Sequence, residues 1–332
     1  MSDVTMPNSA SPANVSLSTR FHTWLSAVPL ATRAVLLVCT AVFVLAATGA
    51  VPQIVQHGAA APYRDLTQPW RLFTHMLIHE QLWHIVLNMM TFVPLAAASE
   101  RAHGSIALVL LLLELSLLGE LVHVAIAALL LAAGFPAAYY TTSIGMSGVI
   151  FSLLVISIHR TANASAANEQ RSLCAIFTVP SSVYPWALLL VIQAFIPSVS
   201  FLGHLSGILV GYLFCLGLFD LIVTPQSIVS RLEGSVLSQR GGFVASSSSI
   251  ASVPRSSPSS ILHAFRNGLS ETWASFRGGL QHLRNRLFGS SPHAHGPAYS
   301  NLPSNAPEPD VEAGASESGD KRFPGTGHRL GG

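Results

Sequence analysis

The chain has 332 residues, of which 50% are hydrophobic and only 10% are charged. This composition excludes an ordinary soluble domain, which carries a larger share of charged residues. The formal net charge of +2 provides no large basic face, so nucleic acid is not expected as a partner.

Polar residues gather at the two ends of the chain, whereas the middle is almost continuously apolar. Segments rich in Ser, Pro and Gly cannot bury enough apolar surface to fold alone. We therefore predict a disordered tail over 1–27, a membrane domain over 28–224 and a mostly disordered tail over 225–332. The N-terminal tail lacks the pattern of a cleaved signal peptide, so the first apolar run is expected to remain as an anchor.

Six apolar runs approach the length of about 20 residues that a bilayer-spanning helix needs. They predict an all-α polytopic bundle of six transmembrane helices, at 31–51, 82–99, 106–131, 144–160, 185–199 and 201–223. An even number of spans puts both tails on one side of the membrane. Arginines concentrate in the short flanks on that side, which predicts that both termini are cytosolic.

The connection between the first two predicted spans, 52–81, is too long for a simple turn. It contains the amphipathic stretch Trp70–Phe73, which is typical of a segment lying partly in the membrane interface. An ordinary loop with an interfacial tryptophan is the alternative.

Strongly polar residues inside a span are costly and mark candidate functional positions. His84 and Asn88 lie in the second span, Ser147 begins the fourth and His204 begins the sixth. These three spans run in the same direction. A rise of about 1.5 Å per residue places the four groups roughly 5–10 Å below the non-cytosolic surface. We therefore expect them to share one shallow cavity.

Ser147 lies in the run Gly145-Met146-Ser147-Gly148, where the glycines remove side-chain bulk and leave the serine accessible. If a helix begins here, the Ser147 N–H is one of its unpaired donors, and the positive end of the helix dipole favours an oxyanion. The same small residues also suit plain helix packing, which stays open as the alternative.

His204 is adjacent to a smooth helix face, because Gly203, Gly207 and Gly211 repeat at four-residue spacing. This face favours close packing on the fourth span, where contact with Ser147 is expected. A neutral imidazole there can act as general base toward the hydroxyl. A packing histidine is the alternative, and the partnered serine at the same depth argues against it.

Two further pairs of polar residues lie on helix faces. His84 and Asn88 are four residues apart and can both direct donors at an oxyanion, although an interhelical hydrogen bond would also explain them. Glu120 and His123 share a face of the third span, where a structural pair is favoured over a catalytic role.

Other intramembrane protease chemistries fit poorly. His79 and His84 are five residues apart, about 140° around a helix, which argues against a shared zinc-binding face. Asp220 is the only aspartate within a predicted span, so an aspartyl mechanism lacks its second carboxylate. We expect neither a metal nor a cofactor.

The chain resembles the rhomboid proteases over about residues 30–223. The likeness lies in the order, spacing and span placement of Trp70-Arg71, His79, His84, Asn88, Glu100-Arg101, Gly145-Met146-Ser147-Gly148, and His204 with Gly207 and Gly211. The resemblance implies a serine endopeptidase with a Ser–His dyad and no third acid. It also implies oxyanion stabilisation by the Ser147 N–H, His84 and Asn88, with Phe151 as the aromatic ring beneath the histidine.

The same resemblance implies single-span membrane proteins as substrates, cut near the non-cytosolic surface. The tail architecture is similar to that of the fungal Golgi-type branch, which implies a cis-Golgi or endoplasmic reticulum membrane. A non-catalytic adaptor like the derlins, which would pass membrane clients to an ATPase, is the alternative. Retention of both Ser147 and His204 favours catalysis. A transporter or channel has little support, because no internal repeat or row of charges lines a path.

The C-terminal tail contains two candidate interaction segments. Apolar residues at three- and four-residue intervals, with arginines nearby, predict an amphipathic helix over 259–288 that lies on the membrane surface or binds a partner. Segment 322–331 resembles the SHP box, a short motif that binds the AAA-ATPase called valosin-containing protein. The matching positions are Phe323, Gly325, Gly327, Arg329 and Leu330.

Overall fold

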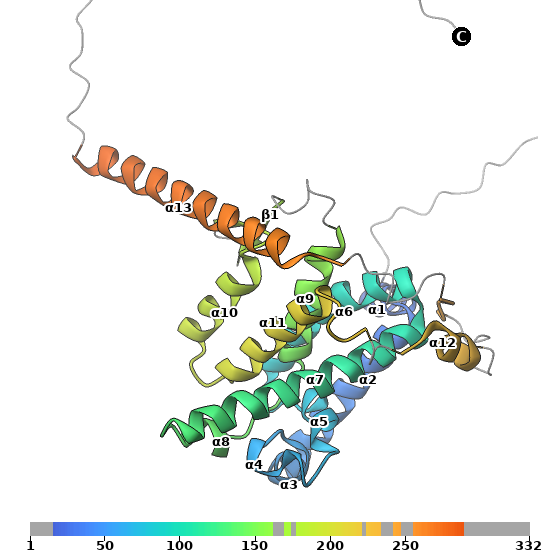
Figure 1. The fold of residues 1–332 in the computed structure, drawn as a ribbon. Helices are drawn as coiled ribbons and strands as arrows, with labels where there is room; N and C mark the ends of the chain where they lie inside the picture. Colours follow the sequence, from blue (N-terminus) through green and yellow to red (C-terminus); the bar gives the residue numbers. More distant parts are fainter. Residues whose placement is uncertain are drawn as a thin grey trace, which may run out of the picture. The chain divides into compact units, whose positions relative to one another are not determined.

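The computed structural model describes residues 16–161, 169–173, 177–220, 224–233, 242–246 and 255–288. The chain divides into two units, Met1–His282 and Leu283–Gly332, and the elements below belong to the first unit except for the end of the last helix. Figure 1 shows their arrangement.

Three apolar helices of the described chain are long enough to cross a membrane. The first, Leu30–Gly58, consists of α2 (Leu30–Leu45), the π-turn η2 (Ala46–Ala50) and α3 (Val51–Gly58). The other two are α6 (Leu82–His103) and α7 (Ser105–Ala132). Three shorter apolar helices follow, at α9 (Ser147–Thr161), α10 (Tyr184–Phe195) and α11 (Phe201–Cys215). The protein is thus a polytopic helical membrane protein.

Two of the shorter helices end earlier than the apolar runs predict. The run over 185–199 gives a helix that stops at Phe195, two residues before Pro197, because the residue before a proline is driven out of the helical region. The run over 201–223 gives a helix that stops at Cys215, because Gly217 adopts a left-handed φ of 76° that terminates helices. Hydropathy alone does not register either signal.

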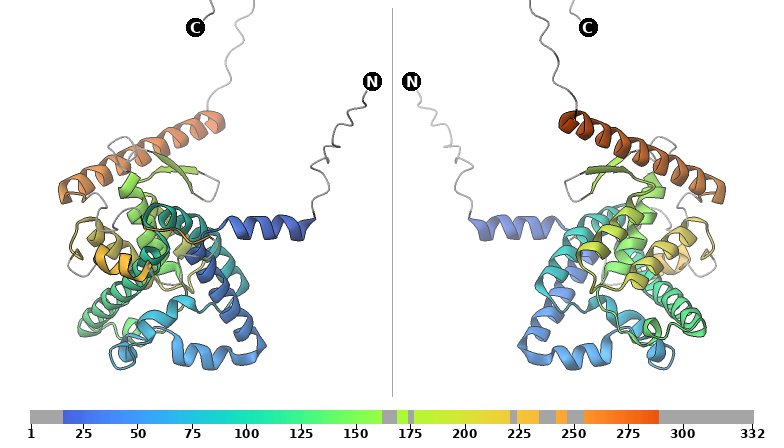
Figure 2. Two further views of the ribbon diagram at one scale, coloured as in Figure 1. Left: turned by 90° about the vertical axis from the view of Figure 1, so that its right-hand side faces the viewer. Right: turned by 90° about the vertical axis from the view of Figure 1, so that its left-hand side faces the viewer.

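The structure adds ordered elements to the two segments predicted to be disordered. Helix α1 (Leu17–Ala27) begins where the Ser16 hydroxyl accepts a hydrogen bond from the Thr19 N–H. In the C-terminal segment the structure adds α12 (Gln226–Glu233), whereas α13 (Pro258–Phe288) lies where the sequence predicts an amphipathic helix over 259–288. The all-α prediction also omitted a small antiparallel hairpin, β1 (Gln170–Leu173) with β2 (Phe177–Pro180), which Figure 2 shows.

The first long connection folds into short helices, at α4 (Pro62–Asp65), α5 (Arg71–Thr74) and η3 (His75–Leu77). The buried Arg71 guanidinium donates to the carbonyl oxygens of Gln56 and Ala59. The Ser116 hydroxyl of α7 donates to the Leu72 carbonyl oxygen at 2.7 Å. These hydrogen bonds fix the connection against the bundle, although Trp70 itself is half exposed.

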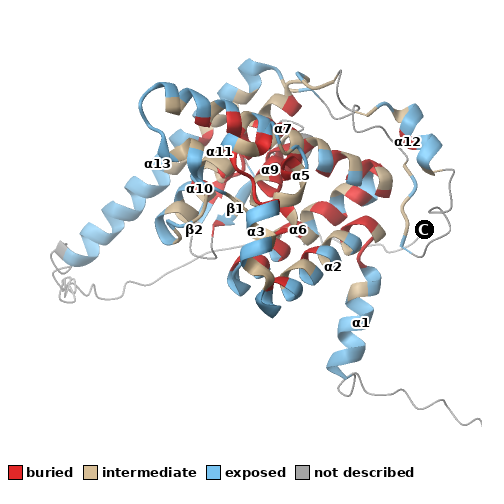
Figure 3. Cartoon of the chain, turned by 90° about the horizontal axis from the view of Figure 1, so that it is seen from below, coloured by how far each residue is buried: buried red, intermediate tan, exposed pale blue. Residues whose placement is uncertain are grey.

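Helix α9 lies in the core of the bundle and packs against α11, α6 and α7. Met146, which precedes it, and Val155 within it are both fully buried. Figure 3 shows that buried residues concentrate on α9 and on the helix faces around it, whereas α1 is largely exposed. A central α9 places its first residue, Ser147, inside the bundle and not on its periphery.

Candidate active site

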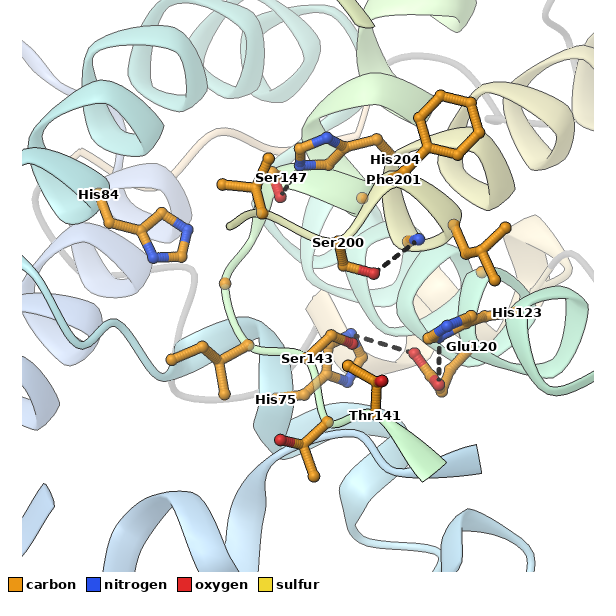
Figure 4. Close-up of a pocket in the computed structure, with 18 of the residues that line it drawn as sticks. His75, His84, Glu120, His123, Thr141, Ser143, Ser147, Ser200, Phe201 and His204 are labelled. Atoms are coloured by element: carbon orange, nitrogen blue, oxygen red, sulfur yellow. Dashed lines mark hydrogen bonds and ion pairs between the residues drawn. The ribbon is translucent and has the colours of Figure 1, made fainter. Parts of the chain in front are cut away.

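Ser147 and His204 meet at the start of two neighbouring helices. Ser147 is the first residue of α9, and His204 lies in the first turn of α11. The His204 Nε2 atom lies 2.7 Å from the Ser147 Oγ atom, which is hydrogen-bond distance. Figure 4 shows the two side chains pointing toward one another. A hydroxyl and an imidazole in this geometry can act as nucleophile and general base.

Close packing of α9 on α11 sets this distance. A Cβ atom at Gly207 would overlap the Gly148 carbonyl oxygen, and one at Gly211 would lie 2.7 Å from the Cβ atom of Val155. The Ser152 hydroxyl crosses the same contact and donates to the Gly207 carbonyl oxygen at 2.7 Å. Only residues without side chains let two helix backbones approach this closely. The glycines therefore hold Ser147 and His204 together.

His204 sits among apolar neighbours. Its side chain is buried, and its ring centroid lies 5.0 Å from that of Phe151, one turn along α9 from Ser147. Within the described residues its Nδ1 atom has no hydrogen-bond partner. The imidazole therefore packs on Phe151 and hydrogen-bonds the Ser147 Oγ atom through Nε2.

His84 borders the turn that leads into Ser147. It lies in the first turn of α6, and a Cβ atom at Gly145 would come within 2.6 Å of its Nε2 atom. Gly145 has a φ of 110°, a region that favours glycine, so both space and backbone require glycine here. The His84 ring is thereby brought beside the turn that leads into Ser147, as Figure 4 shows.

Asn88 lies one turn further along α6 and is buried. Its Nδ2 atom donates to the His84 carbonyl oxygen of its own helix at 2.8 Å. It is not among the described residues that line the cavity around Ser147. The structure therefore groups His84 with Ser147 and His204 but turns the Asn88 donor toward its own helix.

His79 lies between the short helices and α6 and is fully buried beside His84. The two ring centroids are 5.0 Å apart in an edge-on arrangement. Burial, together with the charge of His84, lowers the pKa of His79 to about 4. His79 is therefore uncharged at neutral pH and packs against the His84 ring.

A cavity of about 500 Å³ adjoins Ser147 and His204. Residues 197–204 form one wall, and residues 141–145 form another. This volume is large enough for water and for a stretch of polypeptide. Both water and a polypeptide can therefore reach Ser147 through this space.

A second polar group lines the same cavity. The Glu120 carboxylate hydrogen-bonds His123 Nδ1 at 2.9 Å and lies 3.9 Å from His75 Nε2. The sequence indicates the Glu120–His123 pair on one face of α7, but it does not indicate that His75 joins this pair. The only signal for His75 is that it is an ionisable residue in the long first connection.

The C-terminal motif at 322–331 lies outside the described residues.

Comparison with known proteins identifies similar sequences. A family model described as Rhomboid domain matches residues 66–221. The chain is 30% identical to "Rhomboid-like protein 15" of Arabidopsis thaliana, over 98% of this chain and 74% of that protein. It is also 30% identical to "Rhomboid-type serine protease 2" of Neurospora crassa, over 71% of this chain and 83% of that protein. "Rhomboid-type serine protease B" of Aspergillus fumigatus is 30% identical over 66% of this chain and 77% of its own length.

Proposed function

Because the chain belongs to the rhomboid family, we propose that it is an intramembrane serine protease that hydrolyses peptide bonds in the membrane-spanning segments of other proteins. Ser147 is the nucleophile and His204 is its base. The observation that carries this proposal is the 2.7 Å hydrogen bond between His204 Nε2 and Ser147 Oγ beside a cavity. The curated fungal relatives are named serine proteases.

The reaction follows from this geometry. The Ser147 Oγ atom attacks the scissile carbonyl carbon while the neutral His204 imidazole accepts the hydroxyl proton. The protonated imidazole then donates a proton to the leaving amine, and the peptide C–N bond breaks. Water, deprotonated by the same imidazole, attacks the resulting ester, which releases the acid product and restores the Ser147 hydroxyl.

Negative charge develops on the carbonyl oxygen during each attack and requires donors. The Ser147 N–H belongs to the first turn of α9, where backbone donors have no partner within the helix. His84 is placed to add a side-chain donor, because its ring borders Gly145. The Asn88 amide donates to the His84 carbonyl oxygen and must turn away from it before it can donate to the oxyanion. We assign this donor role to the substrate complex, where catalytic hydrogen bonds often first form.

Cleavage of a model single-span substrate in proteoliposomes tests the assignment. We expect Ser147→Ala and His204→Ala each to lower the cleavage rate at least about a thousandfold. Ser157→Ala is the matched control, because the Ser157 hydroxyl donates to the Leu154 carbonyl oxygen of the same helix and does not line the cavity. A fluorophosphonate probe should label the wild type and S157A but not S147A. Equal cleavage by wild type and S147A would refute the proposal.

The alternative is a non-catalytic adaptor that binds membrane clients. It predicts client binding without cleavage, and without probe labelling at Ser147. The hydrogen-bonded Ser147 and His204 side chains beside a cavity favour the protease, because an adaptor has no need of this geometry.

The membrane setting is part of the proposal. We place both termini in the cytosol, in a Golgi or endoplasmic reticulum membrane, with single-span proteins as substrates. The distribution of arginines in the short flanks supports the orientation. The resemblance of the tails to those of the fungal Golgi-type branch supports the organelle.

A further inference from the structure

Glu120 is a buried carboxylate whose ion-pair partners among the described residues, His123 and His75, are themselves ionisable. Its side chain is 4% exposed, His123 occupies one oxygen at 2.9 Å, and His75 lies 3.9 Å from the other. These residues come from α7 and from η3 of the first connection. A carboxylate has about four lone-pair sites, so the hydrogen bonds with His123 and with the Asp65 carboxyl group leave Glu120 capacity to accept more.

Asp65, at the end of α4, adds a second carboxyl group to this cluster. Its two oxygens accept from the Ala61 N–H at 2.8 and 3.0 Å. Burial raises the pKa of Asp65 to about 7, the Ala61 hydrogen bond lowers it, and the nearby charge of Glu120 raises it further. Two buried carboxyl groups that disfavour each other's charge make a location where a cation is stabilised.

The cluster opens into the cavity that holds the nucleophile. Glu120, His123 and His75 line it together with Ser147 and His204, and Figure 4 shows the two groups at different ends of the same space. Glu80 supplies a further carboxylate from an exposed position. The described residues lining the cavity include no lysine or arginine. Among the described residues that line the cavity, imidazoles are therefore the only basic groups facing the acidic ones.

Arg71, which lies four residues before His75, does not supply a cation to this cluster. The three donor nitrogens of Arg71 are hydrogen-bonded to the Gln68 side chain and to the carbonyl oxygens of Ala59 and Gln56. Its guanidinium thus serves neutral acceptors in the first connection.

We propose that Glu120, oriented by His123 and His75, is a subsite that accepts a lysine or arginine side chain of the polypeptide bound in the cavity. This inference rests on the proposed protease function for the identity of the occupant. The ammonium or guanidinium group hydrogen-bonds the Glu120 carboxylate, which fixes the register of the segment relative to Ser147. Glu120 is a specificity-determining residue and takes no part in bond breaking.

The test places one cationic residue near the cut. The scissile bond of a single-span model substrate is located by mass spectrometry, and Lys, Met or Glu is placed at each of the neighbouring positions in turn. At one position we expect lysine to raise kcat/KM about tenfold over methionine, the size typical of a hydrogen bond to a charged group. The Glu120→Gln enzyme should lose this preference and cut the lysine and methionine substrates with the same kcat/KM.

Glu114→Gln is the matched control. Glu114 lies on the same helix, and its Oε1 atom accepts from the N–H and hydroxyl of Thr224, away from the cavity. This variant should keep the lysine preference. A purely structural role for Glu120 predicts that E120Q slows every substrate by the same factor, which would overturn the proposal. The absence of any position with a lysine preference in the wild type would also overturn it.

Binding to the inactive Ser147→Ala protein separates this inference from the proposed function. The lysine substrate should bind S147A about tenfold more tightly than the methionine substrate, and S147A/E120Q should bind both equally. Preferential binding without any cleavage by the wild type would refute the protease and retain the subsite. Cleavage with equal binding of both substrates would refute the subsite and retain the protease. If E120Q does not fold, Glu120→Asp and His123→Gln are compared instead. Glu120→Asp keeps the charge and should keep a lysine preference. His123→Gln should weaken that preference.

Discussion

The glutamates of α6 and α7 differ in what they bind. Glu100 is fully buried and accepts four hydrogen bonds, two of them from the N–H groups that begin α2. Glu114 accepts two hydrogen bonds from Thr224. These donors are backbone N–H and hydroxyl groups, which do not titrate. Both carboxylates therefore serve to connect segments of the fold by hydrogen bonds. Glu120 has ionisable partners and lines the cavity, which is why we assign it, and not the other two, to a ligand.

Asp65 makes a prediction at the same scale. Because its folded-state pKa of about 7 lies above its ordinary value of 3.8, its contribution to stability is present below pH 3.8 and is lost as the pH rises through 7. Asp65→Asn keeps an acceptor for the Ala61 N–H and does not titrate. Between pH 5 and pH 8 we expect the thermal midpoint of the wild type to fall relative to D65N by at least about 3 °C.

Thermal unfolding in detergent at the two pH values measures this difference. Glu80→Gln is the control for the loss of a carboxyl group, because Glu80 is exposed. An unchanged gap between wild type and D65N at pH 5 and pH 8 would contradict the assignment.

A functional residue can be predicted from the sequence when the local sequence around it is distinctive, and not when only tertiary contacts bring it to the site. Ser147 and His204 stand out in the sequence because a polar group inside an apolar run has a known depth. In the structure their side chains hydrogen-bond. His75 and Asp65 lie in a polar connection, where an ionisable residue is ordinary, and only the tertiary path of that connection brings them to Glu120. The same limit applies to Asn88, whose position on the helix is predictable but whose amide direction is not.

At the scale of helices, the glycine contact between α9 and α11 is predictable from sequence. Four-residue spacing of Gly203, Gly207 and Gly211 predicts a smooth face, and the structure places that face against α9. Helix ends were less predictable, since hydropathy continues past Cys215 although Gly217 terminates the helix.

Gly207→Val tests this contact. The added side chain would overlap the Gly148 carbonyl oxygen, so we expect a loss of about 1–3 kcal/mol of stability and a large loss of cleavage as α9 and α11 separate. Gly119→Ala is the matched control for stability, because a Cβ atom there meets nothing within 4 Å. Thermal unfolding and cleavage assays measure both effects. A G207V protein as stable and active as the wild type would show that the contact does not set the catalytic distance.

At the scale of the whole molecule, the sequence predicts a membrane bundle between two polar segments, and the structure has the bundle. The hairpin β1–β2 could not be predicted, because four-residue strands carry too few alternating positions to distinguish them from loop. The start of α13 is held by a hydrogen bond from the Ser182 hydroxyl to the Ala264 carbonyl oxygen, a contact that only the folded chain creates.

The segment 322–331 leads to a prediction for the full-length chain. We expect the wild type to retain the AAA-ATPase valosin-containing protein in a pull-down, through the apolar anchors Phe323 and Leu330. Phe323→Ala with Leu330→Ala should reduce the retained ATPase at least about tenfold. Arg322→Ala, just outside the matching positions, is the control. Retention that is unchanged in the double variant would remove the motif as a docking site.

The short helices around Ser147 also affect the lipid that surrounds the protein. With 15, 12 and 15 residues, α9, α10 and α11 extend about 22, 18 and 22 Å, whereas an average hydrocarbon layer is about 30 Å thick. Of the three helices α10 is the least buried, with only Pro185 and Leu189 buried, so lipid tails beside it must shorten or tilt to avoid covering polar helix ends. The protein therefore deforms the bilayer locally beside α10, and this deformation costs more as the bilayer thickens.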